Sequence, residues 1–397
     1  MKVGIAKLVE IKSIHIIFYL ALTIISTHCL SQTNTQSDKH IPVLDKSKSY
    51  RSKEFEFQAQ YKYVLLETSR EVLLGENCKL KYASDNRLLF ADEYGGDVFI
   101  FDINGKIYSK FNQKGGLGYT SITSIIYDET KNELFILDRI RKKIYVFSEK
   151  GALLRSFKTP EETFIAEIYN FNDSTLLAFD ENLIGTDKPT KPYFFISRNS
   201  GNIIGYVNIT VEKVNATQFM ESISKNESLS YSFIYTGIPD NCKFGNDFIL
   251  SNKSMDTVYV LRADKSLEPL FTQIPSVHSE HTTAASVGMF TDKYLQICVA
   301  DYDISAATKT MKSGKTWNPP FKLYILDRET REFYRDSEKG KYTVHKTDTP
   351  LNHAYSVMPA IILKEKNKLG RLKGELKTIA SKITINDNPV VEIIQWQ

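Results

Sequence analysis

The sequence predicts an all-β fold, a β-propeller built of four-stranded antiparallel blades, and two observations lead to it. Two segments of short apolar strands match at a constant offset of 46 residues, and the matched pairs are Asp92/Asp138, Phe101/Phe147, Gly105/Gly151 and Phe111/Phe157. A repeat of this length made of short strands is typical of propellers and solenoids. Phe and Tyr also supply all but two of the aromatic residues, and both favour pleated, half-buried strands.

The composition bounds the possible classes of protein. The chain has 397 residues, of which 42% are apolar, enough to bury a large core, so wholesale disorder is excluded. Length alone suggests two or three domains, but a closed β fold can use this much chain as one unit. The net charge of +4 is small for this length, so composition gives no reason to expect a nucleic-acid partner.

The N-terminus predicts an export signal over residues 1–31. Three lysines precede an almost continuous apolar run from Ile14 to Ile25. This run of about 12 residues fits a signal peptide better than a membrane span of roughly 20. Cleavage between Ser31 and Gln32 competes with lipid attachment at Cys29, and His28 before that cysteine favours ordinary cleavage.

Beyond the signal, the sequence predicts a polar flexible segment over residues 32–59 and a single propeller domain over residues 60–397. No other stretch is long and apolar enough for a transmembrane helix. Cys78, Cys242 and Cys298 would remain in the mature chain, too few for a disulfide framework, and we expect buried, inert thiols.

The strands of one blade can be assigned in order in the second repeat. Strands are expected over Ser121–Tyr127, Glu133–Leu137, Lys143–Phe147 and Ala152–Phe157. The turn before the last strand contains Gly151, which supplies the positive φ that tight hairpins need.

Weaker copies of the unit follow, with insertions. A third blade is indicated by Thr175–Asp180 and Tyr193–Ser197, a fourth by 247–271 and a fifth by 294–327. The long insertions at 205–230 and 301–320 interrupt the period, and Val211–Ser224 is expected to form a short helix on the rim.

The C-terminus predicts a short amphipathic helix and a closing strand. The helix is indicated by apolar residues spaced three and four apart, namely Leu369, Leu372, Leu376, Ile379 and Ile383, among many lysines. Such a helix can bind acidic surfaces, although a packed helix with a solvated basic face is the favoured reading. The strand Val390–Trp396 is expected to pair with Tyr63–Glu67, because a ring must join its ends.

These features resemble the exported six-bladed β-propeller family of bacterial envelopes, which is similar to NHL-repeat propellers. The segments Val64–Thr68, Asp256–Tyr259 and Asp387–Val391 resemble that family's motifs. The resemblance covers about residues 60–396 and implies six blades, but it implies no activity. The chain departs from the family at Lys114–Tyr119, where the Pro and Glu of a Gly-rich turn are missing, which puts any role of that turn in doubt.

Few residues point to chemistry. The sequence has no GxSxG, HExxH, Walker A or GxGxxG motif. Recurring aspartates at strand ends are the only weak candidates for a Ca²⁺ site, namely Asp92, Asp138, Asp180, Asp301 and Asp303. Their repetition favours a structural role in shaping turns. No catalytic or cofactor-binding residue is assigned, and Ca²⁺ is the one cofactor considered.

The sequence therefore predicts a non-catalytic binding propeller in the periplasm or cell envelope, with a protein or carbohydrate ligand. The alternatives are a Ca²⁺-dependent hydrolase or lyase, like the gluconolactonase-type propellers, and a glycan-binding protein. We expect a monomer without a nucleic-acid partner, either soluble or lipid-anchored as an outer-membrane lipoprotein.

Overall fold

The computed structural model describes ten stretches of the chain, which are residues 40–52, 59–181, 185–216, 218–222, 229–233, 241–279, 282–301, 303–313, 319–336 and 349–396. Within them, residues from Pro42 onward form one compact unit, and this unit is described below.

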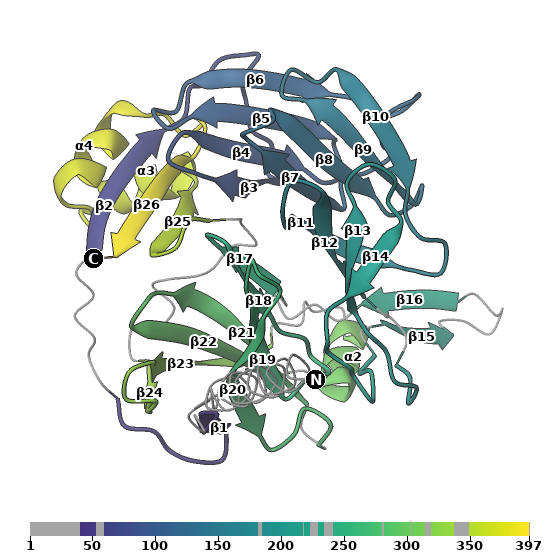
Figure 1. Ribbon diagram of the computed structural model, residues 1–397. Helices are drawn as coiled ribbons and strands as arrows, with labels where there is room; N and C mark the ends of the chain where they lie inside the picture. The colour runs from purple at the N-terminus through teal and green to yellow at the C-terminus, as the bar shows by residue number, and fades with distance from the viewer. Residues whose placement is uncertain are drawn as a thin grey trace, which may run out of the picture. The chain divides into compact units, whose positions relative to one another are not determined.

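Six antiparallel sheets form a ring of blades, which confirms the predicted six-bladed propeller (Figure 1). Blades 1 to 5 are each a meander of four consecutive strands. Blades 1 and 2 consist of β3 (Cys78–Ala83), β4 (Arg87–Asp92), β5 (Asp97–Asp102) and β6 (Ile107–Asn112), and of β7 (Ser124–Asp128), β8 (Glu133–Asp138), β9 (Lys143–Ser148) and β10 (Leu153–Lys158). Blades 3, 4 and 5 consist, in this order, of β11 (Ile165–Asn170), β12 (Thr175–Asp180), β13 (Tyr193–Ser197) and β14 (Ile203–Tyr206); of β17 (Asn241–Phe244), β18 (Asp247–Leu250), β19 (Thr257–Leu261) and β20 (Leu267–Ile274); and of β21 (Thr283–Phe290), β22 (Tyr294–Asp301), β23 (Phe321–Asp327) and β24 (Phe333–Arg335). In the described residues, blade 6 consists of β25 (His353–Met358), β26 (Val390–Trp396) and β2 (Ala59–Leu65).

The core lies between the blades. Strands such as β4 (Arg87–Asp92) and β9 (Lys143–Ser148) bury four residues in a row, because both faces of their sheet are covered by neighbouring blades. Six separate hydrophobic clusters fill the six interfaces, including the one between blade 6 and blade 1, where Val391 and Ile393 meet Leu88 and Phe90. Each cluster joins two neighbouring blades, so the ring is closed by side-chain packing.

The repeated glycines lie where two blades meet. At Gly151 an added Cβ would lie 2.6 Å from the Cβ of Phe111 on the outer strand of the preceding blade. At Gly201 it would lie 2.2 Å from the carbonyl oxygen of Lys158, and at Gly105 it would lie 2.1 Å from that of Leu65. All three glycines have positive φ, so both conformation and space require glycine at this turn.

The ends of the chain join in blade 6, as the sequence predicted. Strand β2 pairs with β26 in antiparallel register from Ala59 opposite Trp396 to Leu65 opposite Val390. Beside this pairing lies Asn388, which is 1% exposed. Its side-chain amide donates hydrogen bonds to the carbonyl oxygens of Glu67 and Val72 and accepts one from the backbone N–H of Leu74.

Part of the N-terminal segment predicted to be flexible lies on the ring. Within residues 32–59, β1 (Val43–Asp45) pairs in parallel with β20 at the outer edge of blade 4. Further along, the Tyr50 ring packs edge-on against Tyr324 of blade 5 at 5.7 Å. The domain boundaries at residues 31 and 59 stay predictions.

The C-terminal region is helical, as predicted, but it forms two short helices and not one continuous helix. Helix α3 (Ala360–Lys368) is followed by Leu369 as its C-cap and by Gly370, whose φ is +67°, and α4 (Gly374–Lys382) comes next. The N–H groups of Gly370 and Arg371 donate to the carbonyl oxygens of Asn367 and Lys366, the hydrogen-bond pattern of a Schellman end. The apolar periodicity continued through a glycine that ends the helix.

The prediction of a helix over Val211–Ser224 was wrong. The β-branched Val211 and Val214 are extended and form isolated antiparallel bridges with Thr190 and Thr186. A hairpin follows, formed by β15 (Gln218–Ser222) and β16 (Leu229–Phe233). The remaining described helix, α2 (Ile304–Lys312), occupies the predicted insertion at 301–320.

We predict that Asn388→Ala lowers the free energy of unfolding by about 3 kcal/mol, because the backbone groups of Glu67, Val72 and Leu74 lose their hydrogen bonds to this buried side chain. Chemical denaturation followed by circular dichroism measures the change. The matched control is Asn386→Ala, two residues away and exposed, which should leave the curve unchanged. Equal curves for both variants would show that Asn388 does not hold the closure together.

We predict that Gly151→Ala destabilises the protein by about 3 kcal/mol, since a positive φ and a crowded site both oppose the new methyl group. The control is Gly116→Ala, whose φ is +49° and whose surroundings leave open space for a Cβ. That variant should lower the free energy of unfolding by about 1 kcal/mol, because only the positive φ opposes the new methyl group. Similar melting temperatures for the two variants would refute a packing role for the turn.

Candidate functional site

The two rims of the ring are built differently. In an antiparallel meander, the turns after the first and third strands lie on one edge, and the turns after the second strand lie on the other edge with the links between blades. On the first edge, called the turn rim, every connection within blades 1 to 5 has two to five residues. On the other edge, called the insertion rim, much longer connections occur, namely residues 181–192, 207–240 and 302–320.

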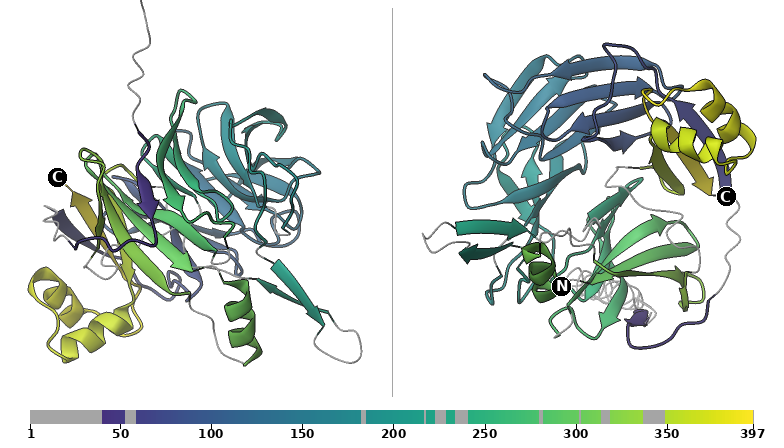
Figure 2. Two further views of the ribbon diagram at one scale, coloured as in Figure 1. Left: turned by 90° about the horizontal axis from the view of Figure 1, so that it is seen from below. Right: turned by 180° about the vertical axis from the view of Figure 1, so that it is seen from behind.

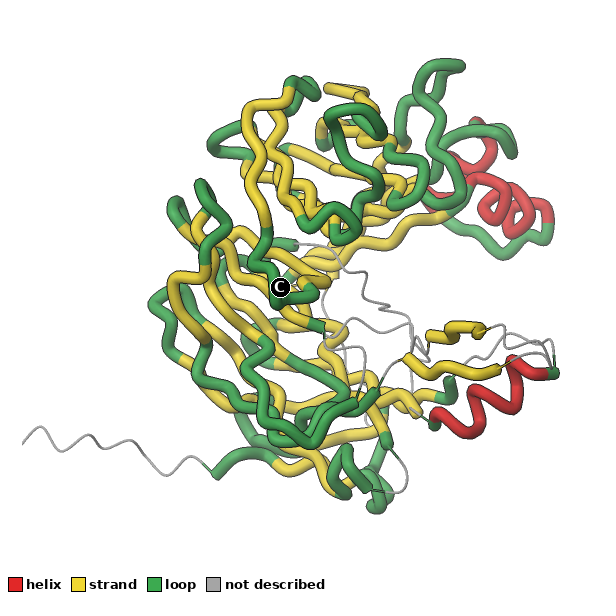
Figure 3. Tube along the Cα trace, turned by 90° about the vertical axis from the view of Figure 1, so that its right-hand side faces the viewer, coloured by secondary structure: helices red, strands yellow, loops and turns green. Residues whose placement is uncertain are grey.

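The insertions and helices lie on the same side of the ring. Figures 2 and 3, which view the ring from two directions, both show α2 and the β15–β16 hairpin on the side where α3 and α4 also lie. Since loops on a rigid scaffold carry most binding and catalytic residues, the insertion rim is the candidate functional face.

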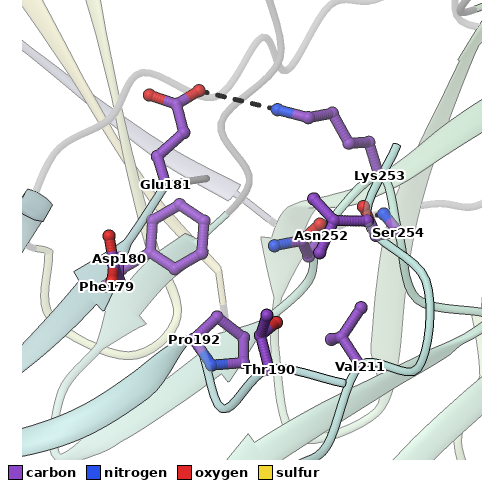
Figure 4. A pocket seen from close by; sticks show the side chains of 10 residues that line it. Phe179, Asp180, Glu181, Thr190, Pro192, Val211, Asn252, Lys253 and Ser254 are labelled. Atoms are coloured by element: carbon purple, nitrogen blue, oxygen red, sulfur yellow. Dashed lines mark hydrogen bonds and ion pairs between the residues drawn. The ribbon is translucent and has the colours of Figure 1, made fainter. Parts of the chain in front are cut away.

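A recess opens on this rim between blades 3 and 4 (Figure 4). One wall is the end of β12 with Phe179 and Asp180, and the facing wall is the turn 252–254 of blade 4. Val211 and Val214 of the extended segment close a third side, over Thr190 and Pro192 of the 181–192 insertion. Segments distant in the sequence thus converge on one small hollow.

An ion pair crosses the recess. The Lys253 ammonium lies 3.5 Å from a carboxylate oxygen of Glu181, and the lysine side chain is only 7% exposed. The other oxygen of that carboxylate lies 3.5 Å from the Arg139 guanidinium, which stacks 4.4 Å from the centre of the Phe164 ring. One carboxylate therefore meets two cations, and Arg139 connects the recess to blade 2.

Exposed apolar side chains extend the face over blades 1 and 2. Leu117 is 88% exposed, Ile140 72% and Tyr94 71%, and all three lie in connections of the insertion rim. The Arg141 guanidinium donates to the carbonyl oxygens of Gly116 and Gly118, so the Ile140 turn lies against the Leu117 loop. Apolar and cationic groups side by side on an exposed rim are typical of an interaction surface.

The strand-end aspartates predicted as weak metal candidates bind backbone N–H groups. Asp92 accepts from Tyr94 and Gly95 in its own turn. Asp138 accepts from Thr120 at 2.6 Å, and Asp180 accepts from Phe164 at 2.8 Å. Each of the latter two fastens the end of its strand to the loop that enters the same blade, and burial raises the pKa of the Asp180 carboxyl.

The other two candidates end a strand and begin a helix. Asp301 is the last residue of β22, and the Asp303 carboxylate accepts a hydrogen bond from the Ala306 N–H at 2.9 Å, the bond of a helix N-cap. Throughout the described stretches, no group of three or more His, Cys, Asp or Glu side chains is arranged to hold a metal ion. The five aspartates are not brought together as one such group.

Among the described residues, Cys78, Cys242 and Cys298 form no disulfide. Burial is the main cause that raises the pKa of both Cys78 and Cys298 to about 12. The predicted processing residues Cys29, Ser31 and Gln32 lie outside the described residues. Among the helices that are described, none has the length and apolar character needed to cross a membrane.

Sequence reasoning missed the recess and the exposed apolar side chains. Tyr94 and Ile140 occupy equivalent positions, 46 residues apart, two residues after the repeated aspartate. These apolar residues lie in turns, where polar residues are expected, and this departure could have indicated the exposed apolar surface. Nothing in the sequence could pair Glu181 with Lys253, because only the ring brings the two blades together.

Comparison with known proteins agrees with the fold. The model of a family described as a domain of unknown function, DUF4934, matches residues 39–395. The structure of a candidate exported protein from Bacteroides fragilis is 14% identical, with a TM-score of 0.60, and the match covers 90% of this chain and 99% of that one. No curated protein matches.

Two further structures resemble the chain less. A member of the DUF4221 family from Bacteroides vulgatus is 11% identical with a TM-score of 0.45, over 85% of this chain and 98% of that one. Virginiamycin B lyase from Staphylococcus aureus is 8% identical with a TM-score of 0.37, over 86% of this chain and all of the other. Such low scores carry no argument about function.

We predict that removing Glu181 and removing Lys253 lower the free energy of unfolding by different amounts. Glu181→Gln takes the carboxylate away from a nearly buried lysine and should destabilise by about 2 kcal/mol, whereas Lys253→Met leaves the carboxylate beside Arg139 and should cost less than about 1 kcal/mol. Thermal and urea unfolding of both variants measure the difference. The double variant should be more stable than Glu181→Gln alone, and the reverse order would contradict this account of the pair.

Proposed function

The chain belongs to the DUF4934 family, and we propose that it is a non-catalytic binding propeller, exported to the bacterial cell envelope, that holds its ligand on the insertion rim. The observation that carries the proposal is the asymmetry of the ring. Ten connections on the turn rim stay at two to five residues, while the long segments 181–192, 207–240 and 302–320 leave from the other. A ring that only needed to close would have no reason to lengthen one rim alone.

The chemistry of the rim favours binding. Leu117, Ile140 and Tyr94 expose apolar surface that a ligand can cover, which is the favourable part of most associations. Arg141 and Lys114 lie beside them and add charge that can orient a partner. The aspartates first considered for metal binding use their carboxylates on backbone N–H groups, which supports a structural role for them.

Export is proposed from the N-terminal pattern. Residues 1–31 combine a basic start, the apolar run Ile14–Ile25 and a polar continuation. Cleavage after Ser31 would release the chain into the periplasm, and lipid attachment at Cys29 would tether it to a membrane. The name of the Bacteroides fragilis protein, a candidate exported protein, is in keeping with this proposal.

The test measures binding by the rim. The mature chain is immobilised, exposed to a solubilised envelope fraction and to a glycan array, and the retained component is purified for titration. We predict that Leu117→Ser with Ile140→Ser weakens its affinity at least tenfold, because a few exposed anchors dominate most interfaces.

The matched control is Leu153→Ser with Leu154→Ser, two exposed leucines on the outer strand of blade 2 that are 46% and 51% exposed. It should bind as the wild type does. Equal affinity of the rim variant and the wild type would show that the ligand does not bind at this face. Turnover of a lactone or sugar by the purified chain with millimolar Ca²⁺ would overturn the non-catalytic part.

A further inference from the structure

The helical hairpin formed by α3 and α4 concentrates the positive charge of the protein. Residues 360–385 contain seven cationic side chains, namely Lys364, Lys366, Lys368, Arg371, Lys373, Lys377 and Lys382, against Glu365 and Glu375. The hairpin therefore carries +5, while the whole chain carries +4, so the other residues sum to −1. The charge is local and cannot be a general property of the surface.

These cations face solvent. Every one except the half-buried Lys364 is exposed, and no ion pair among the described residues joins any of them to a carboxylate. Lys364 donates instead to the carbonyl oxygen of Ala380 at 3.1 Å and so fastens α3 to α4. The structure of the hairpin therefore does not account for the other six.

Large apolar side chains lie exposed among the lysines. Ile385 is 57% exposed, Ile361 55%, Leu369 54% and Ile362 41%. Other apolar residues of the hairpin are buried and pack on Val390 of blade 6, namely Ala360, Leu363, Leu372, Ala380 and Ile383. The hairpin is thus fixed to the ring by one set of apolar side chains, and a second set is exposed to solvent.

We propose that the α3–α4 hairpin docks the ring onto an anionic lipid surface. Lysine and arginine would lie at the headgroup phosphates while the exposed isoleucines and leucine enter the boundary with the acyl chains, the arrangement of interfacial helices. A nucleic acid or an acidic protein would satisfy the charges as well, but a nucleic-acid backbone offers no partner for four exposed aliphatic side chains. The combination of both groups on one projecting element favours lipid.

The position of the hairpin suits this role. Figure 2 shows α3 and α4 projecting from one side of the ring, clear of the other blades. A nearly flat surface could therefore touch the hairpin before it reached most of the ring. This inference does not depend on which ligand the insertion rim holds.

The test is binding of the mature chain to lipid vesicles. Vesicles of phosphatidylcholine alone are compared with vesicles in which a third of the lipid is phosphatidylglycerol, by flotation at low and at physiological salt. We expect binding to the anionic vesicles, weakened by salt, and little binding to phosphatidylcholine. Each neutralised cation should weaken binding about fivefold, so Lys366→Gln, Lys368→Gln, Arg371→Gln and Lys373→Gln together should weaken it by more than a hundredfold.

The control removes the same charge elsewhere. Lys106→Gln, Lys131→Gln, Lys150→Gln and Lys265→Gln neutralise four exposed lysines in turns of the opposite rim and should leave vesicle binding within about twofold of the wild type, since cations away from the membrane gain little from its short-ranged field. A third variant, Ile361→Ser with Ile385→Ser, should bind less tightly at physiological salt. Circular dichroism checks that all variants fold.

Three results would overturn the proposal. The wild type could fail to float with anionic vesicles at low salt, or the hairpin variant could bind as the wild type does. The control variant could also lose as much affinity as the hairpin variant, which would make net charge the cause. Retention on DNA or on an acidic peptide without any vesicle binding would assign the hairpin to that class of partner instead.

Discussion

The fold depends on the close approach of one blade's glycine turn to the outer strand of the blade before it. Gly151 meets Phe111 and Gly201 meets Lys158 through contacts that leave no room for a Cβ. Gly105 makes the same approach to Leu65 of β2, a strand from the N-terminus that pairs with the C-terminal β26. The contact that stacks neighbouring blades therefore also closes the ring, and β2 takes the outer place in its blade that β6 and β10 take in theirs.

This constraint explains why function gathers on one rim. Turns that must fit against a neighbouring blade cannot lengthen without opening the interface, and interiors packed this closely do not tolerate added volume. Connections on the insertion rim also make contacts, for example Arg141 with the loop of Gly116 and Gly118, but several of them are much longer. Lengthening a surface loop has only a modest entropic cost. The 181–192 insertion, α2 and the hairpin of β15 and β16 use that freedom, and the recess forms where two of these long connections meet.

The sequence predicted most of the fold because the repeat itself records the constraint. The glycine, the aspartate and the two phenylalanines recur at 46-residue spacing in the units of blades 1 and 2, where the structure gives the glycine and the aspartate roles in the turns. Gly201 takes the same place in blade 3, whereas Lys265 and Arg331 have the positive φ in the corresponding turns of blades 4 and 5. Local exceptions were harder to predict. The apolar spacing from Leu369 to Ile383 could not reveal that Gly370 takes a positive φ and ends the helix. The candidate site is not periodic, and Glu181 and Lys253 come together only through the geometry of the closed ring.

The distribution of charge and the two-sided structure of the ring combine into one picture of how the protein would work. Lipid docking through α3 and α4 would turn the side that carries α2 and the β15–β16 hairpin toward the membrane, because all of them project the same way (Figure 2). The recess between blades 3 and 4 and the exposed Leu117 and Ile140 belong to this rim. A ligand held there would then lie between the ring and the lipid surface, so a membrane-bound or surface-attached partner would reach it more readily than one diffusing to the turn rim. The two proposals rest on different residues, yet they assign the same face of the ring to function.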